Sequence, residues 1–317
     1  MNNKTVLIFG CTGQDGSLLS RSLLKKGSRV IGTTRKKTNG VANFSRLGIE
    51  KDVLVKEIDI TCFEEVEKLI ETFSPQQIYN LSCQSSVGKS FSNPKETLDS
   101  TIKSTLNILE VAKQTSYSGK LFFAGSGEIY GHTDIGATLE SIQQPSSPYA
   151  VGKQTSFNLV KLYREIYCIK CLTGVLFNHE SPLRPKSFIT QKIIQGVKDI
   201  SEKKKTKLTI GNIDVIRDWG WAPEYVEAMQ AITDSGLIKD QIICTGRGTR
   251  LKIFISKVFS FYGLNWKDFI EIDKSFFRPN EIMQNYGNPE RLNKELGWKS
   301  ETELDTIIEK LINKNLN

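Results

Sequence analysis

A glycine-rich turn near the start of the chain constrains the fold more than any other feature. An apolar, β-branched run at 5–9 (TVLIF) leads directly into the sequence GCTGQDG, and leucine pairs at helical spacing follow. Strand, glycine turn and helix in this order are typical of a dinucleotide-binding unit, because glycine lets the backbone turn tightly and approach a pyrophosphate. The N–H groups at the helix start bind that charge. The sequence therefore predicts a nucleotide site at Gly10, Thr12, Gly13, Gln14, Asp15 and Gly16.

Strand-like and helix-like patterns alternate through the first half of the chain. Apolar runs at 29–34, 53–58, 77–81, 121–124 and 171–177 predict further strands, and 97–114 predicts one long amphipathic helix. Such alternation predicts an α/β fold of the Rossmann type, a doubly wound parallel sheet covered by helices on both faces. We expect residues 1–170 to form mainly the dinucleotide-binding domain, which also receives part of the later chain. Residues 171–317 should form mainly a smaller C-terminal α/β domain that binds the substrate.

The end of the second predicted strand indicates which dinucleotide is bound. The strand at 29–34 runs into Arg35, Lys36 and Lys37, and no acid occupies this segment. An acid here would accept hydrogen bonds from the adenosine ribose, whereas arginine and lysine would meet a 2′-phosphate. We therefore expect NADP, with NAD as the alternative.

The next strand end supplies a candidate for adenine. Asp59 could place its carboxylate near the adenine amino group, and the alternative is a cap for the helix that starts near Phe63. The remaining expected cofactor contacts are Ile60 and, at the end of the fourth strand, Leu81.

A tyrosine and a lysine stand four residues apart at the head of a helical pattern. Tyr149 and Lys153 would lie on one helix face, where the ammonium favours the phenolate, so that the tyrosine becomes a base near neutral pH. Upstream, an apolar strand stops at small residues that include Ser126, and Glu128 follows at once. A packed tyrosine beside a solvated lysine is the plainer interpretation of this spacing; the glycine-rich turn favours the catalytic one.

Four basic residues in the second half stand among prolines, glycines and aromatics rather than on predicted helix surfaces. They are Arg184, Lys192, Arg217 and Arg278. A guanidinium binds phosphate oxygens through two parallel bonds, so these residues suit a diphosphate clamp; four unrelated surface cations are the alternative. The net charge of +8 is otherwise spread over short lysine runs without an aromatic stripe, which favours a small anionic substrate over nucleic acid.

Cysteine use and hydropathy exclude several other classes of protein. The six cysteines are scattered without the spacing of a disulfide framework, and Cys168-x-x-Cys171 has no second pair and only two histidines to complete a zinc site. We therefore expect no metal. No apolar run is long enough to cross a bilayer and the first residues do not resemble a signal peptide, so we expect a cytoplasmic protein without a membrane partner.

Taken together, these segments resemble the extended short-chain dehydrogenase/reductase superfamily and, within it, the GDP-mannose 4,6-dehydratases. The similarity spans nearly the whole chain and is carried by eight segments in order: GCTGQDG at 10–16, YNL at 79–81, QSSV at 84–87, SPYA at 147–150, FNHESP at 177–182, RDWG at 217–220, FRP at 277–279 and ELGW at 295–298.

The resemblance implies a reaction and a role for each matching residue. Tyr149 would take the proton of the sugar 4-hydroxyl as hydride leaves C4 for the nicotinamide, and Lys153 would hold the nicotinamide ribose and lower the tyrosine pKa. Ser126 would hydrogen-bond the 4-oxygen, and Glu128 would remove the C5 proton before water leaves from C6. The resemblance also implies a homodimer or homotetramer and a set of substrate contacts: Ser85, Val87, Asn178, Arg184, Lys192, Arg217, Arg278 and Glu281.

One position departs from the family pattern. Between Ser126 and Glu128 the family commonly carries a hydroxyl residue, and related dehydratases an aspartate, that assists departure of the 6-hydroxyl; here the residue is Gly127. The redox step at C4 is therefore better supported than the elimination. A GDP-sugar 4,6-dehydratase for mannose or manno-heptose remains our first expectation. A C4 dehydrogenase or 4-keto reductase without dehydration is the second, and a non-catalytic dinucleotide sensor the third.

Overall fold

Seven parallel strands form the central sheet of the computed structural model, which describes residues 4–35 and 41–316. Their order is β10-β6-β5-β4-β1-β2-β3. The strands are β1 (Thr5–Phe9), β2 (Arg29–Thr34), β3 (Leu54–Glu57), β4 (Gln77–Asn80), β5 (Lys120–Ser126), β6 (Cys171–Leu176) and β10 (Gln241–Ile243). The predicted Rossmann-type sheet is confirmed, although the predicted strand at 53–58 is shorter by one residue at each end. Lys36 and Lys37 lie outside the described residues.

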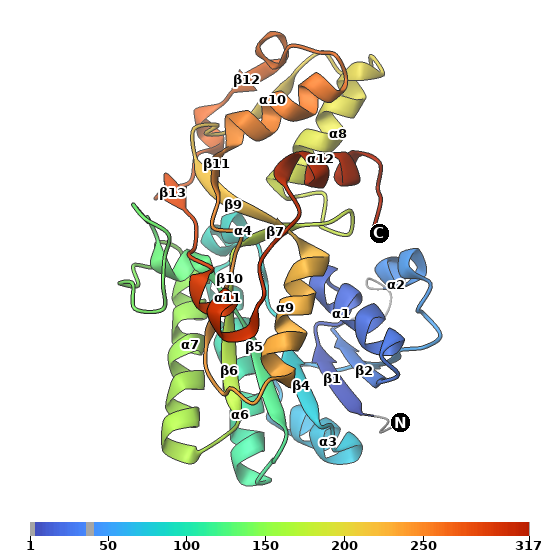
Figure 1. Ribbon diagram of the computed structural model, residues 1–317, viewed down its shortest axis with the longest axis vertical. Helices are drawn as coiled ribbons and strands as arrows, with labels where there is room; N and C mark the ends of the chain where they lie inside the picture. Colours follow the sequence, from blue (N-terminus) through green and yellow to red (C-terminus); the bar gives the residue numbers. More distant parts are fainter. Residues whose placement is uncertain (1–3, 36–40, 317) are drawn as a thin grey trace.

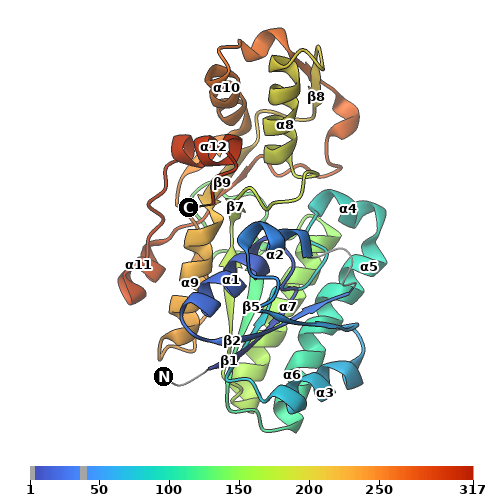
Figure 2. The same ribbon diagram turned by 90° about the vertical axis from the view of Figure 1, so that its right-hand side faces the viewer.

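Alternating side chains of the strands bury both faces of the sheet. Val6 and Ile8 of β1 join the core on one face, whereas Leu7 and Phe9 join the core on the other, as the two-residue period of a strand requires. The first face is covered by α1 (Gln14–Lys25) and α9 (Ala222–Asp234). The second is covered by α3 (Phe63–Phe73), α6 (Ser104–Gln114) and α7 (Pro148–Tyr167). Figures 1 and 2 show these helices flanking the sheet, with α2 (Val41–Leu47) beside α1.

The long helix predicted at 97–114 is interrupted. A π-helical segment (Asp99–Lys103) separates α5 (Pro94–Leu98) from α6 without a break in the chain direction. Thr101 Oγ1 donates to the Thr97 carbonyl, and the Thr101 carbonyl accepts from both Thr105 Oγ1 and Ser156 Oγ of α7. Hydroxyls that bond helix carbonyls compete with the backbone ladder, which accounts for the widened turn.

A second, smaller region stands above the carboxyl ends of the central strands (Figure 1). Here β9 (Ile216–Trp221) pairs with β11 (Gly248–Arg250), β13 (Gln284–Asn285) and β7 (Asn178–Glu180). A separate pair consists of β8 (Leu208–Ile210) and β12 (Ile270–Ile272). The core of this region holds Trp219 and Trp221 of β9, packed with α8 (Ile189–Ser201), α10 (Leu251–Phe261) and α12 (Leu304–Ile312).

The chain passes between the two regions more than once. After β6 it enters the smaller region through β7, and it returns to the central sheet with α9 and β10. It then crosses again to β11 and α10, while α11 (Glu290–Leu296) lies near β10. The central sheet is therefore built from both halves of the sequence.

The order of the strands in the central sheet indicates where a ligand site lies. It reverses between β1 and β4, and ligands of open α/β sheets bind outside the carboxyl ends of the strands at such a reversal. Among the described residues, no helix combines the length and the apolar character needed to cross a membrane.

Candidate active site

A single cavity of about 1330 Å³ lies between the carboxyl ends of the central strands and the smaller region. Its lining includes all the candidate site residues that lie within the described part of the chain. They are Gly10, Thr12, Gly13, Gln14, Asp15, Gly16, Arg35, Asp59, Ile60, Leu81, Ser85, Val87, Ser126, Glu128, Tyr149, Lys153, Asn178, Arg184, Lys192, Arg217, Arg278 and Glu281. The fold thus brings these residues to one cavity, while the role of each stays a prediction.

Two of the three glycines in the turn after β1 are needed because the backbone approaches closely. Gly10 has φ +79°, and a Cβ there would lie 2.9 Å from the carbonyl oxygen of Leu81. A Cβ on Gly16 would meet the backbone of Gly10 and Cys11. Gly13 is the N-cap of α1, and no side chain caps this helix start. The turn therefore offers backbone N–H groups and the positive end of a helix dipole to the cavity, as a pyrophosphate requires.

Tyr149 and Lys153 both lie near the start of α7, which begins at Pro148, so they share a helix face as predicted. Lys153 Nζ lies 5.8 Å from the centroid of the Tyr149 ring and donates to the Ala124 carbonyl at 2.7 Å. Cys83, which the sequence placed only among scattered cysteines, lines the same cavity and raises the pKa of Lys153.

The predicted low pKa of Tyr149 is not what the structure gives. Burial raises the pKa of Tyr149 above its ordinary value, and this outweighs the lowering by the Lys153 charge and by a hydrogen bond with Ser126. Burial alone would lower the pKa of Lys153, but Cys83 and Tyr149 raise it, so the lysine is charged. The Lys153 charge lowers the pKa of Tyr149, as predicted, but burial of the phenol raises this pKa by more.

Glu128 follows β5 in a short 3-10 turn (Gly127–Tyr130). Its backbone N–H donates to Ser126 Oγ at 3.3 Å, which fixes the start of the turn beside the serine hydroxyl. Oε1 lies 3.8 Å from Arg278 Nη1, whereas Oε2 is buried and has no hydrogen-bond partner. A Cβ on Gly127 would lie 2.6 Å from the Phe177 ring, so an aromatic side chain fills the space where the family has a hydroxyl residue.

The four basic residues predicted to bind a diphosphate all line the cavity, and three of them face carboxylates. Arg184 pairs with Glu180 at 2.6 Å, and Arg217 Nη2 lies 3.3 Å from Glu281 Oε1. Arg278 faces Glu128, as described above. The fourth, Lys192, lies 5.6 Å from the centroid of the Phe276 ring. These pairings join residues that sequence patterns cannot connect, and they keep the positive charges compensated inside the cavity.

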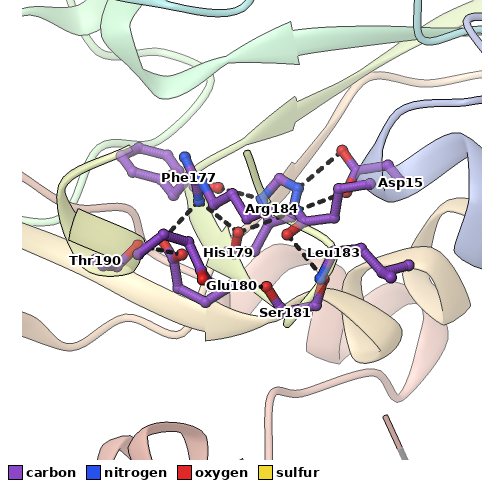
Figure 3. Close-up of polar contacts among 10 residues, drawn as sticks. Asp15, Phe177, His179, Glu180, Ser181, Leu183, Arg184 and Thr190 are labelled. Carbon is purple, nitrogen blue, oxygen red and sulfur yellow. Dashed lines mark hydrogen bonds and ion pairs between the residues drawn. The ribbon is translucent and has the colours of Figure 1, made fainter. Parts of the chain in front are cut away.

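Figure 3 shows a polar network that sequence reasoning missed, centred on His179. His179 Nε2 lies 2.9 Å from Asp15 Oδ2 of the glycine-rich turn, and Nδ1 lies 2.7 Å from the Phe177 carbonyl oxygen. The His179 carbonyl accepts from both Gln14 and Arg184. The network ties the glycine-rich turn to residues 177–184, and it places Arg184 beside that turn. The FNHESP segment at 177–182 is the part of the sequence that could have indicated this network, because it carries a histidine just after a predicted strand.

The Asp15–His179 contact makes stability depend on pH. Burial opposes both charges, but the pair lowers the pKa of Asp15 and raises the pKa of His179. A raised histidine pKa gives stability that is complete below about pH 6.5 and is lost as the pH rises through the folded-state pKa. A lowered aspartate pKa gives stability that is complete above about pH 4 and is lost as the pH falls through its folded-state value.

We expect Asp15→Asn to cost about 2 kcal/mol of unfolding free energy between about pH 4 and 6.5, and less at higher pH. Urea unfolding of both proteins across this range measures the difference. A difference that stays constant up to pH 9 would contradict a charged pair.

Arg35 and Asp59 line the cavity just after the ends of β2 and β3. Asp59 is exposed, and its Oδ1 accepts from the backbone N–H and the hydroxyl of Thr61, which lowers its pKa. The N-cap of α3 is Cys62, so the alternative interpretation of Asp59 as the cap of that helix is wrong. Arg35 is exposed, and Nη1 lies 3.3 Å from Glu96 Oε1.

Comparison with known proteins identifies the family to which this chain belongs. The sequence profile described as "GDP-mannose 4,6 dehydratase" matches residues 7–311. The chain is 35% identical to "GDP-mannose 4,6 dehydratase 2" of Arabidopsis thaliana, over 99% of this chain and 87% of that protein. It is 32% identical to "GDP-mannose 4,6-dehydratase" of Vibrio cholerae serotype O1, over 100% of this chain and 94% of that protein.

Among solved structures, a dTDP-glucose 4,6-dehydratase from Bacillus anthracis in complex with NAD superposes with a TM-score of 0.85 at 18% identity, covering 98% of this chain and 96% of that one. This likeness concerns the fold. The matches to the family profile and to both relatives span nearly the whole chain, and the chain belongs to the GDP-mannose 4,6-dehydratase family.

Proposed function

We propose that the protein is a GDP-sugar 4,6-dehydratase acting on GDP-mannose or GDP-manno-heptose. The observation that carries the proposal is that one cavity holds both a proton-transfer pair and a separate carboxylate. Tyr149 and Lys153 come from α7, while Glu128 enters from the end of β5 with one oxygen that has no hydrogen-bond partner. Oxidation at C4 needs only the pair, whereas elimination across C5–C6 also needs a base that does not take part in the redox step.

The residues around the glycine-rich turn fit a nicotinamide dinucleotide. Gly10 and Gly16 let the backbone of the turn pack closely where a Cβ would collide with it, and the uncapped start of α1 suits a pyrophosphate. When bound, the nicotinamide supplies the acceptor for the C4 hydride and returns a hydride to C6, so the cofactor ends unchanged. The residues assigned to hold it are Gly10, Thr12, Gly13, Gln14, Asp15, Gly16, Arg35, Asp59, Ile60, Leu81, Tyr149 and Lys153.

The side chains of the chain perform the proton transfers. Tyr149 takes the proton of the 4-hydroxyl, and the Lys153 ammonium favours the phenolate that this requires by lowering the tyrosine pKa against the effect of burial. Ser126, which hydrogen-bonds Tyr149, holds the 4-oxygen. The ketone at C4 makes the C5 proton acidic, and Glu128 removes this proton and passes it to the 6-hydroxyl, which leaves as water.

The basic residues around the cavity would bind the GDP diphosphate together with Asn178 of β7. Arg217 and Arg278 would exchange their carboxylate partners for phosphate oxygens, and Lys192 lies on the same side in α8. Ser85 and Val87, before and at the start of α4 (Val87–Ser92), would contact the sugar. Arg184 reaches the same cavity from beside the glycine-rich turn.

We propose NADP rather than NAD, because Arg35 lies at the cavity end after β2 and no acid follows that strand. Charge-assisted hydrogen bonds contribute about 1.5–3 kcal/mol, so we expect Arg35→Ala to weaken NADP binding by about 10- to 100-fold. NAD, which lacks the 2′-phosphate, should bind this variant nearly as it binds the unchanged protein. Fluorescence titration with each dinucleotide measures both affinities, and equal losses for the two would contradict the assignment.

Gly127 favours a second candidate, an enzyme confined to C4. The Phe177 ring fills the space beside Gly127, so no side chain at this position assists departure of the 6-hydroxyl. Such a protein would act as a GDP-sugar C4 dehydrogenase or a 4-keto reductase and would turn over cofactor. The complete set of Ser126, Tyr149 and Lys153 argues against the third candidate, a sensor without activity.

We also propose a homodimer or homotetramer in the cytoplasm. Apolar side chains along α7 are exposed, with relative exposures of 41% for Val151, 46% for Leu162 and 67% for Ile166, and a second copy would cover them. All six cysteines are free thiols, which suits a reducing compartment.

Mass spectrometry of GDP-mannose and GDP-manno-heptose after incubation with the protein, with and without NADP or NAD, tests the proposal. Loss of one water without net cofactor reduction is the expected result. Loss of two hydrogens coupled to cofactor reduction would identify the C4 dehydrogenase instead. Unchanged sugar nucleotides under all conditions would contradict both.

A further inference from the structure

The turn that carries Glu128 is held by a side chain from a distant part of the chain. We call residues 127–131 the base turn. Its two ends are glycines: Gly127 directly after β5, and Gly131, whose φ of +63° closes the turn. The side-chain amide of Asn285 in β13 lies between the carbonyl oxygens of these two glycines. Asn285 Nδ2 donates to Gly127 O at 3.0 Å and to Gly131 O at 2.8 Å.

Only an amide or a similar double donor suits this position. Both partners are carbonyl oxygens, so the atom between them must carry two N–H bonds, which the asparagine amino group does and a carboxylate does not. Asn285 has a relative exposure of 3%, so water does not readily replace it. Buried carbonyl groups without hydrogen-bond donors are unfavourable. Without the Asn285 amide, the base turn would therefore change its conformation until other donors reach these carbonyls.

The strand that carries Asn285 pairs with a strand of the predicted diphosphate site. In the parallel pairing of β13 with β9, Asn285 lies opposite Arg217. Arg217 pairs with Glu281, which precedes β13 by three residues, and Arg278 faces Glu128. The Phe177 ring packs between the two segments, because a Cβ on Gly127 or on Gly287 would lie 2.6 or 2.7 Å from it. Base turn and diphosphate site are thus parts of one packed unit.

We propose that Asn285 is a positioning residue for the elimination step. It fixes the carboxylate of Glu128 relative to the proposed diphosphate site, and hence relative to C5 of the bound sugar. This inference rests on the proposed function, since it assigns Glu128 to the C5 proton. Asn285 does not contact Tyr149 or Lys153 through any hydrogen bond of the described residues, so C4 oxidation does not depend on it in the same way.

The test compares the two chemical steps in the same variant. In Asn285→Asp, which keeps the shape but removes both donors, and in Asn285→Ala, we expect kcat for the dehydrated product to fall by about 10- to 100-fold, as for a misplaced catalytic group. The KM for the sugar nucleotide and the rate of C4 oxidation, followed as reduced cofactor, should change by less than about 3-fold. The undehydrated 4-keto sugar should therefore accumulate. Asn285→Ser, which keeps one donor, serves if both variants fail to fold.

Gln284 provides a matched control from the adjacent position of the same strand. Its Nε2 likewise donates to two backbone carbonyls, those of Thr133 and Asp134, just beyond the base turn. Gln284→Ala removes the same number of hydrogen bonds and should leave the ratio of dehydrated to 4-keto product unchanged. A parallel loss of both products in the Asn285 variants, or an equal shift of the ratio in Gln284→Ala, would overturn the proposal.

Amide hydrogen exchange separates this inference from the proposed function. We expect the N–H groups of residues 127–131 to exchange at least about 10-fold faster in Asn285→Ala and at the unchanged rate in Gln284→Ala. If the unchanged protein forms no dehydrated product, the proposed function fails, and faster exchange still shows that Asn285 holds the turn. Unchanged exchange in Asn285→Ala refutes the positioning role whatever the reaction is.

Discussion

Glu128→Gln should stop formation of the dehydrated sugar while C4 oxidation continues. General base catalysis contributes about 100- to 10,000-fold, and glutamine cannot accept the C5 proton, so we expect the elimination rate to fall by that factor. The substitution keeps the size of the side chain and the N–H bond to Ser126 Oγ, so the turn should keep its shape. Mass spectrometry of the product, together with deuterium exchange at C5 in D₂O, follows the step directly.

The oxidation step provides the control for this variant. Cofactor affinity and the single-turnover reduction of the cofactor should remain within about 3-fold of the unchanged protein, because Glu128 lies outside the glycine-rich turn. The 4-keto sugar should then be released with net cofactor reduction. Full dehydration by the Glu128→Gln variant would show that Glu128 is not the base. No residue would then be assigned to remove the C5 proton.

Tyr149→Phe should abolish both steps together. Without the phenol no group of the cavity takes the 4-hydroxyl proton, and the ketone that makes C5 acidic never forms; we expect losses of about 100- to 10,000-fold in cofactor reduction and in dehydration alike. Stopped-flow absorbance of the reduced cofactor measures the first, and product analysis the second.

Tyr163 on the same helix is the matched control for this substitution. Its hydroxyl donates to Glu110 of α6 and does not line the cavity, so the Tyr163→Phe variant should turn over substrate normally. The assignment of Tyr149 fails if its phenylalanine variant still reduces the cofactor at more than about a tenth of the normal rate.

Local patterns were sufficient to predict the scaffold of the site. The glycine turn after β1 and the four-residue spacing of Tyr149 and Lys153 involve only residues that are close together in the sequence. Both can therefore be recognised from the pattern of the sequence alone. The fold then brings the strand ends to one edge, which is why every candidate lines the same cavity.

Contacts between distant segments could not be predicted. Nothing in the sequence connects Asn285 with Gly127, 158 residues earlier, or selects Glu281 as the partner of Arg217. The raised pKa of Tyr149 has the same origin, because its cause is the depth of burial rather than the neighbouring lysine. The interruption of the helix before α6 depends partly on Ser156 of another helix.

The contribution of both chain halves to the central sheet bears on how the protein is synthesised. β10 completes the sheet beside β6, and α9 packs on α1, with Gln230 donating to Ser22 Oγ 208 residues away. A ribosome must therefore release most of the polypeptide before the apolar surface of α1 is covered. Nascent chains that stall earlier would expose this surface to aggregation or to chaperones, and truncation before α9 should yield insoluble protein rather than an isolated nucleotide-binding domain.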